Sequence, residues 1–231
     1  MRVLIVDVGG SNVKLWLSDR EGRRKFDSGE EMTPSRMIAQ TLRAAEDWPF
    51  DAVALGLPCR VVAGRPTEEP EHLGKGWVDF NYESFTKPVR IINDANLQAI
   101  GCYRGGRMLF VGLGTHVGSC LVADNVIVSL DLGHLLNADG DEIWTVLNKR
   151  SLKRLGAEKW RKQVRRILPR LMRATLADEV VIGGGQADEL EELPEGMRRG
   201  SNADVRLGGM RLWEELPDPG AGGADAGWRV V

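Results

Sequence analysis

The chain has 231 residues, 42% hydrophobic and 28% charged, with a formal net charge of −2. This length fits one large domain or two small lobes and is enough to bury a hydrophobic core. The small net charge excludes an overall positive electrostatic field that would attract nucleic acid. The apolar run at residues 3–8 is too short for a signal peptide or a membrane span. Cys59, Cys102 and Cys120 lack metal-ligand spacing and disfavour a disulfide framework. We therefore expect a cytoplasmic protein that engages neither membranes nor nucleic acid.

Apolar runs and turn residues predict the elements of the first half. A strand at 3–8 ends at two glycines and is followed by a hairpin partner at 13–17. Thr33–Pro34 is typical of a helix start. We expect the remaining elements of this half as a strand at 52–57, a long loop region at 58–88, a strand at 89–92 and a helix at 95–103.

The second half repeats the pattern of strand, glycine turn and strand. DVGGS at 7–11 is echoed by GLGTHVGS at 112–119, which suggests two lobes with a cleft between them, divided near residue 106. We expect strands at 108–113, 117–123, 126–130 and 180–182, two helices over 141–173, a last helix at 207–216 and a flexible tail at 217–231.

Two glycine turns have the composition of phosphate-binding hairpins. In the first, Gly9 and Gly10 allow backbone N–H groups to approach phosphate oxygens, Ser11 adds a hydroxyl, and Asp7 could hold the waters of a Mg²⁺ ion. Gly112 to Ser119 repeats this arrangement. An ordinary tight hairpin explains each turn equally well.

Two further motifs follow strands. Asp94 comes after the strand at 89–92 and opens a helix, where it could be a catalytic base that accepts a hydroxyl proton or simply an N-cap; the neighbouring Asn93 favours a polar site. Gly183, Gly184 and Gly185 lie between a strand and a predicted helix, where a flat or anionic ligand could approach the backbone, although a simple turn is an alternative.

The order and spacing of these motifs resemble the ROK family of sugar kinases, in particular the short branch that contains polyphosphate glucokinases. The matching stretches are LIVDVGGSNVK (4–14), KPVRIINDAN (87–96), FVGLGTHVGSCLV (110–122), DLGHL (131–135), VVIGGGQADELEELP (180–194) and LGGMRLW (207–213). The resemblance implies an α/β fold of two actin/hexokinase-like (ribonuclease H-like) lobes around a ligand cleft. Residues 1–106 would form the first lobe and 107–216 the second, with the last helix packed back on the first.

The resemblance also implies a function: transfer of a phosphoryl group from ATP or polyphosphate to a glucose-like hexose, with Mg²⁺, in a protein that can form a homodimer. Asp94 is then the general base and Asp7 lies on the metal side. Asn93 binds the sugar together with Asp131 and His134, which fall where the family has Glu-x-Gly-His. The donor would be held by Gly9, Gly10, Ser11, Asn12, Lys14, Gly114, Thr115, Gly183, Gly184 and Gly185.

Three departures from the family pattern leave other functions open. Asp131 is one methylene shorter than the family's Glu, His116 replaces a glycine of the second turn, and no cysteine follows His134 to form a zinc knuckle. The first two favour a catalytically impaired sensor that binds a sugar or nucleotide. A DNA-binding repressor is disfavoured because Met1 directly precedes the first strand, and a pantothenate-kinase-like enzyme is disfavoured by the Asp-Leu-Gly-His stretch.

One basic stretch is a further candidate for donor binding. Residues 149–173 contain 11 Lys or Arg and one acid, Glu158. An apolar helical stripe runs through the stretch, and Lys162, Arg165 and Arg166 point away from it. Such charges usually form a solvated helix face, and the functional alternative is a track for a polyanion.

Overall fold

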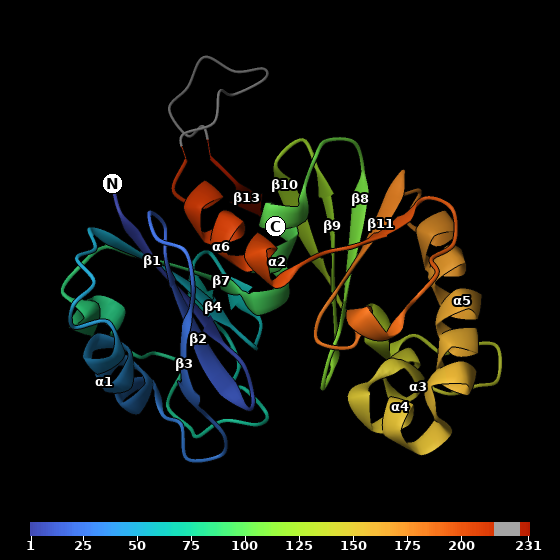
Figure 1. The fold of residues 1–231 in the computed structure, drawn as a ribbon, viewed down its shortest axis with the longest axis horizontal. Helices are drawn as coiled ribbons and strands as arrows, with labels where there is room; N and C mark the ends of the chain where they lie inside the picture. The colour runs from blue at the N-terminus through green and yellow to red at the C-terminus, as the bar shows by residue number, and fades with distance from the viewer. Residues whose placement is uncertain (215–226) are drawn as a thin grey trace. The chain divides into compact units, whose positions relative to one another are not determined.

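The computed structural model describes residues 1–214 and 227–231 and has a mixed α/β fold, as predicted (Figure 1). The chain divides into two compact units. The first contains Met1–Gly101 and Val205–Trp228, and the second contains Cys102–Asp204 and Arg229–Val231. In the sequence-based division the first unit ends at residue 106, whereas here it ends at Gly101 and takes in a later segment as well.

The first unit is built on a five-stranded sheet with the order β3-β2-β1-β4-β7. β1 pairs antiparallel with β2 and parallel with β4, and β4 pairs parallel with β7. The sequence predicts every strand except β3, whose residues RKFD are half-buried or exposed and form no apolar run. The strands are β1 (Val3–Val8), β2 (Asn12–Leu17), β3 (Arg24–Asp27), β4 (Ala52–Leu57) and β7 (Val89–Asn93).

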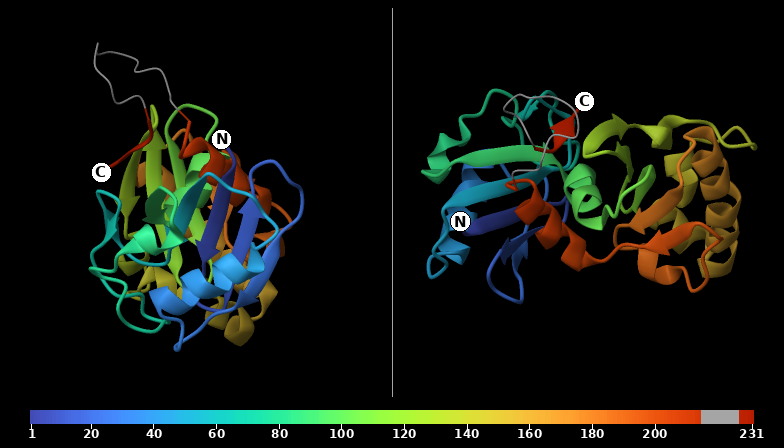
Figure 2. Two further views of the ribbon diagram at one scale, coloured as in Figure 1. Left: turned by 90° about the vertical axis from the view of Figure 1, so that its left-hand side faces the viewer. Right: turned by 90° about the horizontal axis from the view of Figure 1, so that it is seen from above.

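Helices cover both faces of this sheet because β1 is apolar throughout and must be buried on each side. On one face, α1 (Pro34–Ala44) is capped by Thr33 and buries Met37 and Ile38 against the strands (Figure 2, left). On the other face lie α2 (Asp94–Cys102) and α6 (Asn202–Arg211).

Arginine bonds to backbone carbonyls fasten α6 in the first unit. Arg206 donates to the carbonyls of Leu17 and Ser18, and Arg211 donates to those of Ile100 and Gly101 at the end of α2. The sequence predicts this helix at 207–216, but it begins at Asn202 and ends at Arg211, and residues 215–216 lie outside the described part of the chain.

The region 58–88 is more ordered than the long loop that the sequence predicts. It contains β5 (Val61–Val62), β6 (Arg65–Pro66) and the 3-10 helix η1 (Tyr82–Phe85). Trp77 is fully buried in the core, and its Nε1 donates to the carbonyl of Gly74 at 2.6 Å. The Glu69 carboxylate accepts the backbone N–H groups of Gly76 and Trp77 at 3.0–3.1 Å, so a buried indole and a charged anchor hold the region in place.

Trp77→Ala tests whether this anchor matters for stability. Because the substitution removes a fully buried side chain and its hydrogen bond, we expect it to lower the free energy of unfolding by about 3–5 kcal/mol. Val62→Ala, at a residue that is 47% exposed in the same region, is the matched control and should change stability by less than about 0.5 kcal/mol. Urea unfolding followed by circular dichroism measures both, and equal effects would contradict the assignment of Trp77 to the core.

The second unit contains a six-stranded sheet with the order β12-β11-β8-β9-β10-β13. β8, β9 and β10 pair antiparallel, whereas β11 pairs parallel with β8, β12 with β11, and β13 with β10. β12 and β13 are not predicted from the sequence. The strands are β8 (Met108–Leu113), β9 (Val117–Ala123), β10 (Val126–Leu130), β11 (Glu179–Gly183), β12 (Met197–Arg199) and β13 (Arg229–Val230).

The pairing of β13 corrects the prediction of a flexible tail at 217–231. Residues 217–226 of this tail lie outside the described residues, but Arg229 and Val230 pair with Val126 and Ile127 of β10. The last residues of the chain therefore belong to the sheet of the second unit.

Three helices, and not the two that the sequence predicts over 141–173, follow one another in the second unit. These are α3 (Ile143–Leu147), α4 (Lys149–Leu155) and α5 (Ala157–Ala174). The Asn148 side chain caps α4 by accepting the N–H of Ser151, and Gly156 separates α4 from α5 with a φ of 78°. The predicted apolar stripe of α5 is confirmed, since its five members are all buried: Trp160, Val164, Ile167, Leu168 and Leu171.

The three cysteines, Cys59, Cys102 and Cys120, are all free and buried. Burial raises the pKa of the Cys59 thiol to about 12 and also raises the pKa values of Cys102 and Cys120. Within the described residues, no helix combines the length and the apolar character that crossing a membrane requires.

Candidate functional site

The first glycine turn joins β1 to β2 and keeps backbone donors available. The Gly9 N–H donates to the Asn12 carbonyl at 3.0 Å, and Ser28 Oγ donates to the Gly9 carbonyl. In the described part of the chain, the N–H groups of Gly10 and Ser11 have no hydrogen-bond acceptor. Two adjacent N–H groups of this kind can bind an anion such as a phosphate.

Asp7 and Lys14 form a cross-strand pair just below this turn. The two residues are opposite each other in the β1–β2 register, and Lys14 Nζ lies 3.3 Å from Asp7 Oδ2. Asp7 is buried, and this burial raises the pKa of its carboxyl, although Lys14 acts in the opposite direction. The sequence-predicted residues Asp7, Gly9, Gly10, Ser11, Asn12 and Lys14 thus lie on one hairpin.

Asn93, and not Asp94, supplies the side-chain cap of α2. Asn93 Oδ1 accepts the N–H groups of Ala95 at 2.9 Å and Asn96 at 3.2 Å, while its Nδ2 donates to the carbonyl of Cys59 at 3.1 Å. Its amide therefore fixes the start of the helix and ties it to the segment after β4. Asp94 accepts only the Ala95 N–H, through Oδ1, and its Oδ2 has no hydrogen-bond partner among the described residues.

Gly56 lets the start of α2 approach the sheet. A Cβ at this position would lie 2.8 Å from Leu97 Cδ2 and 3.4 Å from Asp94 Cα, so a larger residue would push the helix away. Gly56 is also opposite Asp7 in the β1–β4 register. Sequence reasoning missed this residue because a single glycine inside an apolar strand gives no signal of what packs on it.

These contacts place Asp94 in an environment that favours its neutral form. Burial, followed by the negative charge of Asp7, raises the pKa of the Asp94 carboxyl from 3.8 to about 7, while the Ala95 N–H and Lys14 oppose the shift. A carboxyl with a pKa near 7 is suited to accept a proton at neutral pH. The alternative role of Asp94 as the helix cap is filled by Asn93.

A titration of Asp94 tests this environment directly. We expect its side-chain carboxyl carbon, followed by ¹³C NMR and assigned by its loss in Asp94→Asn, to titrate near pH 7 in the unliganded protein. In Asp7→Asn the midpoint should move to lower pH, because a neighbouring negative charge is removed. A wild-type midpoint near 4 would show that the carboxylate is well hydrated and would contradict the assignment.

The second glycine turn joins β8 to β9 in the second unit. The Gly114 N–H donates to the His116 carbonyl at 3.1 Å, and the Gly114 carbonyl accepts the N–H of Lys149, the first residue of α4, at 2.9 Å. Thr115 has no hydrogen-bond partner among the described residues. The His116 ring stacks on Trp144, with centroids 5.6 Å apart, so the residue that replaces the family's glycine packs on an aromatic side chain.

The glycine run after β11 lies against the end of β8. Gly184 has a φ of +80°, and a Cβ there would lie 2.2 Å from the Leu113 carbonyl oxygen, so only glycine fits. A Cβ at Gly185, by contrast, would meet nothing within 4 Å. Gln186 is buried, and its Oε1 has no hydrogen-bond partner among the described residues. The helix predicted after this run is only the short 3-10 helix η3 (Ala187–Glu189).

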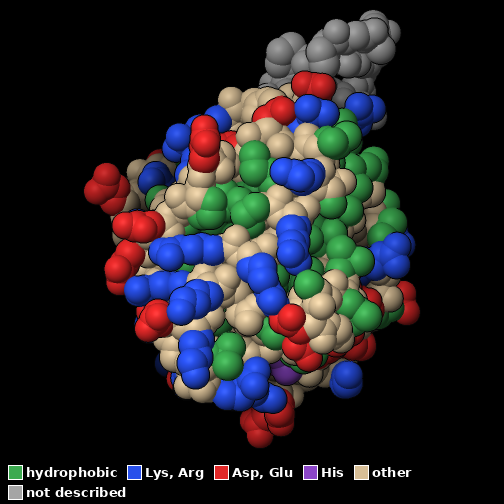
Figure 3. Space-filling view, turned by 90° about the vertical axis from the view of Figure 1, so that its right-hand side faces the viewer, with side chains coloured by type: hydrophobic (Ala, Val, Ile, Leu, Met, Phe, Trp, Pro, Cys, Tyr) green, Lys and Arg blue, Asp and Glu red, His purple; other side chains and the backbone are tan. Residues whose placement is uncertain are grey.

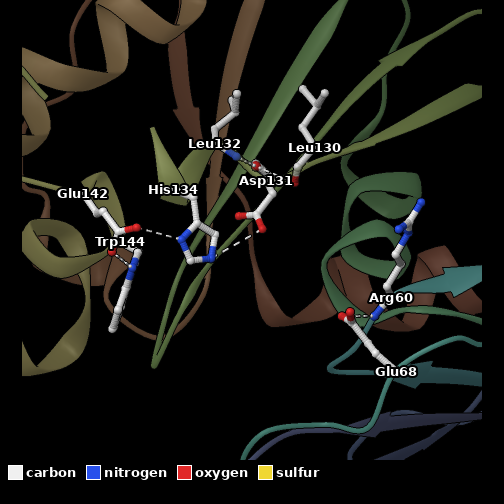
Figure 4. A network of polar contacts seen from close by, with 9 residues as sticks. Arg60, Glu68, Leu130, Asp131, Leu132, His134, Glu142 and Trp144 are labelled. Atoms are coloured by element: carbon white, nitrogen blue, oxygen red, sulfur yellow. Dashed lines mark hydrogen bonds and ion pairs between the residues drawn. The ribbon is translucent and has the colours of Figure 1, made fainter. Parts of the chain in front are cut away.

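Asp131 and His134 belong to a polar cluster that includes two residues the sequence did not suggest (Figure 4). His134 Nδ1 lies 3.0 Å from Glu142 Oε1, and His134 Nε2 lies 3.6 Å from Asp131 Oδ2. Trp144 Nε1 donates to the other Glu142 oxygen at 2.8 Å. Both bonds to Glu142 lower the pKa of its carboxyl. The imidazole thus lies between two carboxylates, one of which is fixed by an indole.

Ser119 links this cluster to the sheet. Its hydroxyl donates to the carbonyl of Leu130 at 2.9 Å and accepts the N–H of Leu132 at 3.1 Å, which fixes the start of the 3-10 helix η2 (Leu132–His134). Sequence reasoning missed Glu142 and Trp144, and it named Ser119 only as the end of the second glycine turn. The only available signal was that His134 is polar and exposed and would need partners to hold its ring.

Comparisons with known proteins find similarity at the level of the fold. No protein-family model and no curated protein matches the sequence. The inorganic polyphosphate/ATP-glucomannokinase of Arthrobacter sp. strain KM matches with a TM-score of 0.76 and 20% identity, over 90% of this chain and 96% of its own. A ROK family glucokinase from Streptomyces griseus, in complex with glucose and AMPPNP, matches with a TM-score of 0.66 and 15% identity, over 90% and 98%.

The chain has the fold of the ROK sugar kinases. A ROK family transcriptional regulator, a homolog of the E. coli MLC protein, shares this fold with a TM-score of 0.63 and 13% identity, over 90% of this chain and 76% of its own. The ROK fold is therefore compatible with both catalysis and regulation, and the site residues must decide between them.

On this ROK fold, four basic residues of α5 are paired with acids: Arg161, Lys162, Arg165 and Arg166. Figure 3 shows Lys and Arg side chains gathered on the face of the second unit that carries α5, with Asp and Glu among and around them. Lys162 pairs with Glu158 at 3.1 Å and Arg165 with Glu192 at 3.7 Å, and Arg166 pairs with Asp139. The three residues proposed as a polyanion track already have acidic partners, which favours the alternative of a solvated helix face.

The basic residues of α4 differ from those of α5. Lys149, Arg150, Lys153 and Arg154 are all exposed, and none of them forms an ion pair with an acid in the described part of the chain. α4 also begins at the hydrogen bond to Gly114 of the second turn. If any part of the stretch 149–173 attracts an anion, α4 is the helix on which every basic residue lacks an acidic partner among the described residues, whereas α5 is partly compensated.

Proposed function

We propose that the protein is a sugar kinase that transfers a phosphoryl group from ATP or polyphosphate to a hydroxyl of a glucose-like hexose. The observation that carries the proposal is the environment of Asp94: a half-buried carboxyl at the start of α2, relieved of capping by Asn93, with its pKa raised to about 7 beside the Asp7–Lys14 pair. The ROK fold and the glucokinases that share it support the choice of reaction.

In this mechanism Asp94 accepts the proton of the attacking hydroxyl. Its Oδ1 is held by the Ala95 N–H, and Oδ2 is left to take the proton. At neutral pH a carboxyl with a pKa near 7 is ionised in about half of the molecules, and the ionised form can accept the proton of the hydroxyl. Asn93 acts as a positioning residue because its side chain caps α2. The sugar contact that the resemblance implies would use the hydrogen-bonding capacity of the amide that the cap and the bond to Cys59 leave over.

The first hairpin has the groups that a phosphoryl donor with Mg²⁺ requires. Asp7 is a buried carboxyl whose charge raises the pKa of the neighbouring Asp94, and Lys14 is the cation paired with Asp7. This excess of acid fits a divalent cation, which Asp7 would hold through oxygen ligands. When bound, Mg²⁺ would offset negative charge on the phosphoryl oxygens. The N–H groups of Gly10 and Ser11 would bind phosphate oxygens directly.

The second unit offers separate features for a nucleotide and for a sugar. Gly185 borders open space, and the buried Gln186 Oε1 is an acceptor that finds no donor among the described residues, as expected where a nucleotide approaches the backbone. Gly114 and Thr115 would hold phosphate at the second turn. Asp131 and His134 would contact sugar hydroxyls, and Glu142 keeps the imidazole oriented for that contact.

Asp94→Asn tests the proposal. The amide keeps the shape of the carboxyl but cannot accept a proton, so we expect kcat to fall about 10²–10⁴-fold while sugar binding is nearly unchanged. A coupled assay over a hexose panel, with ATP and polyphosphate in parallel, measures kcat, and calorimetry measures sugar binding. Asp19→Asn, at an exposed aspartate, is the matched control. If Asp94→Asn keeps more than about half of the wild-type kcat, Asp94 is not the base.

A catalytically impaired sensor remains the second candidate, because His116 stands at the second turn with its ring stacked on Trp144. The same measurements separate the two functions. A sensor would bind a hexose or nucleotide in calorimetry and show no turnover with any donor in the wild-type protein, whereas an enzyme would show turnover that depends on Asp94.

The choice of donor can be tested on α4. We expect the triple variant Arg150→Gln, Lys153→Gln, Arg154→Gln to raise the polyphosphate KM about tenfold at low salt and to leave the ATP KM within about twofold, because a long polyanion depends more on unpaired cations. The wild-type polyphosphate KM should also rise with salt. The control variant Lys162→Gln, Arg165→Gln, whose cations are already paired, should change neither KM. Equal effects of both variants would contradict a role of α4 in binding polyphosphate and would leave its basic residues as a solvated surface.

A further inference from the structure

A short loop joins His134 to Glu142 and folds back on itself. Leu136 and Glu142 form an antiparallel bridge, and the Ile143 N–H donates to the Leu135 carbonyl at 2.9 Å. Nearer the tip, the Asn137 N–H donates to the Asp141 carbonyl at 2.8 Å. His134 and Glu142 therefore stand at the two ends of one narrow hairpin, and the 3.0 Å contact between them depends on how that hairpin is held.

The tip of the hairpin is shaped by its own amide and tied to α5 by a guanidinium. Asn137 Oδ1 accepts the N–H groups of Asp139 at 2.7 Å and Asp141 at 3.2 Å. The Asp139 carboxylate accepts hydrogen bonds from both Nη atoms of Arg166, and the bond from Nη1 to Oδ1 is 3.1 Å long. Gln163, one turn earlier on α5, accepts from the same guanidinium at 2.9 Å. Bidentate pairs of this kind fix orientation as well as distance.

This pair is the tether between the hairpin and α5. No other hydrogen bond or ion pair joins residues 135–141 to α5 within the described chain. The Arg166 side chain is 35% exposed, and its Nε is buried without a hydrogen-bond partner among the described residues. The guanidinium is thus directed to one carboxylate and is poorly placed to bind a ligand from solution.

We propose that Arg166 is a positioning residue for the sugar site, acting through Asp139 on the hairpin that sets Glu142 against His134. This inference rests on the proposed function, in which His134 contacts the sugar. It assigns Arg166 a role on the acceptor side of the reaction and separates it from the donor-binding role that its basic surroundings suggest. Without the tether the hairpin tip is no longer held against α5. Glu142 then no longer holds the imidazole in one orientation, and sugar binding weakens.

Kinetics of a double-mutant cycle test the role. We expect Arg166→Gln and Asp139→Asn each to raise the sugar KM about fivefold to tenfold, with the donor KM and kcat within about twofold of wild type, and the double variant to be no worse than either single one. Arg165→Gln is the matched control on the same helix and should have no effect, since its partner Glu192 lies on a different segment. Independent effects of Arg166 and Asp139, or a raised donor KM in Arg166→Gln, would overturn the proposal.

A spectroscopic readout separates this inference from the proposed function. The ring nitrogens of His134, observed by long-range ¹H–¹⁵N correlation and assigned with His134→Gln, should shift or broaden in Arg166→Gln and remain unchanged in Arg165→Gln. If the His134 signals do not respond to Arg166→Gln, the inference fails whatever the activity. If they respond but the wild-type protein phosphorylates no hexose, the proposed function fails and the tether stands.

Discussion

The position of the half-buried Asp94 beside the buried Asp7 is the constraint on which the candidate site of the first unit depends. Loss of hydration and the charge of Asp7 disfavour the ionisation of Asp94, and Lys14 opposes this effect only partly. Between pH about 4 and about 7 the folded state holds a proton on Asp94 that the unfolded chain has released, so the contribution of this group to stability falls as pH rises through that window. The neighbouring structure must compensate, and it does so through the Asn93 cap and the close packing that Gly56 allows.

In the second unit the site side chains are held in place differently, because the polar cluster is exposed and lies on loops. Asp131 and His134 have side chains that are 72% and 63% exposed, so burial cannot hold them. His134 is oriented instead by its contacts with Asp131 and with Glu142, whose carboxylate also accepts Trp144 Nε1. Ser119 bonds to the backbone of Leu130 and Leu132, on either side of Asp131. Rigidity in the first unit thus comes from packing, whereas in the second it comes from a chain of directed polar contacts.

The sequence predicts the elements whose signal is local. Apolar runs reveal β1, β4 and β8, and Thr33–Pro34 reveals the start of α1, because each depends on adjacent residues only. The edge strand β3 carries charged residues and gives no such signal. In the candidate site, the adjacent polar residues Asn93 and Asp94 do not reveal which one caps the helix, since that depends on backbone orientation.

Partners that are brought together by folding are beyond such reasoning. Glu142 follows His134 by eight positions, with a turn between them, and nothing in the spacing predicts that their side chains meet. The positive charge of the stretch 149–173 is evident from the sequence, but its partial neutralisation on α5 is not, because acids such as Asp139 and Glu192 come from elsewhere in the chain. Net charge along a sequence is therefore a poor guide to net charge on a surface.

The buried thiols have a practical consequence. With their pKa values raised by burial, Cys59, Cys102 and Cys120 stay protonated at neutral pH, and a protonated thiol is a weak nucleophile. A maleimide reagent should therefore leave all three thiols unmodified in the native protein. A single cysteine introduced on an exposed position, one in each unit, would then carry a fluorophore selectively, which makes the wild-type chain a ready background for measuring distances between the units by energy transfer.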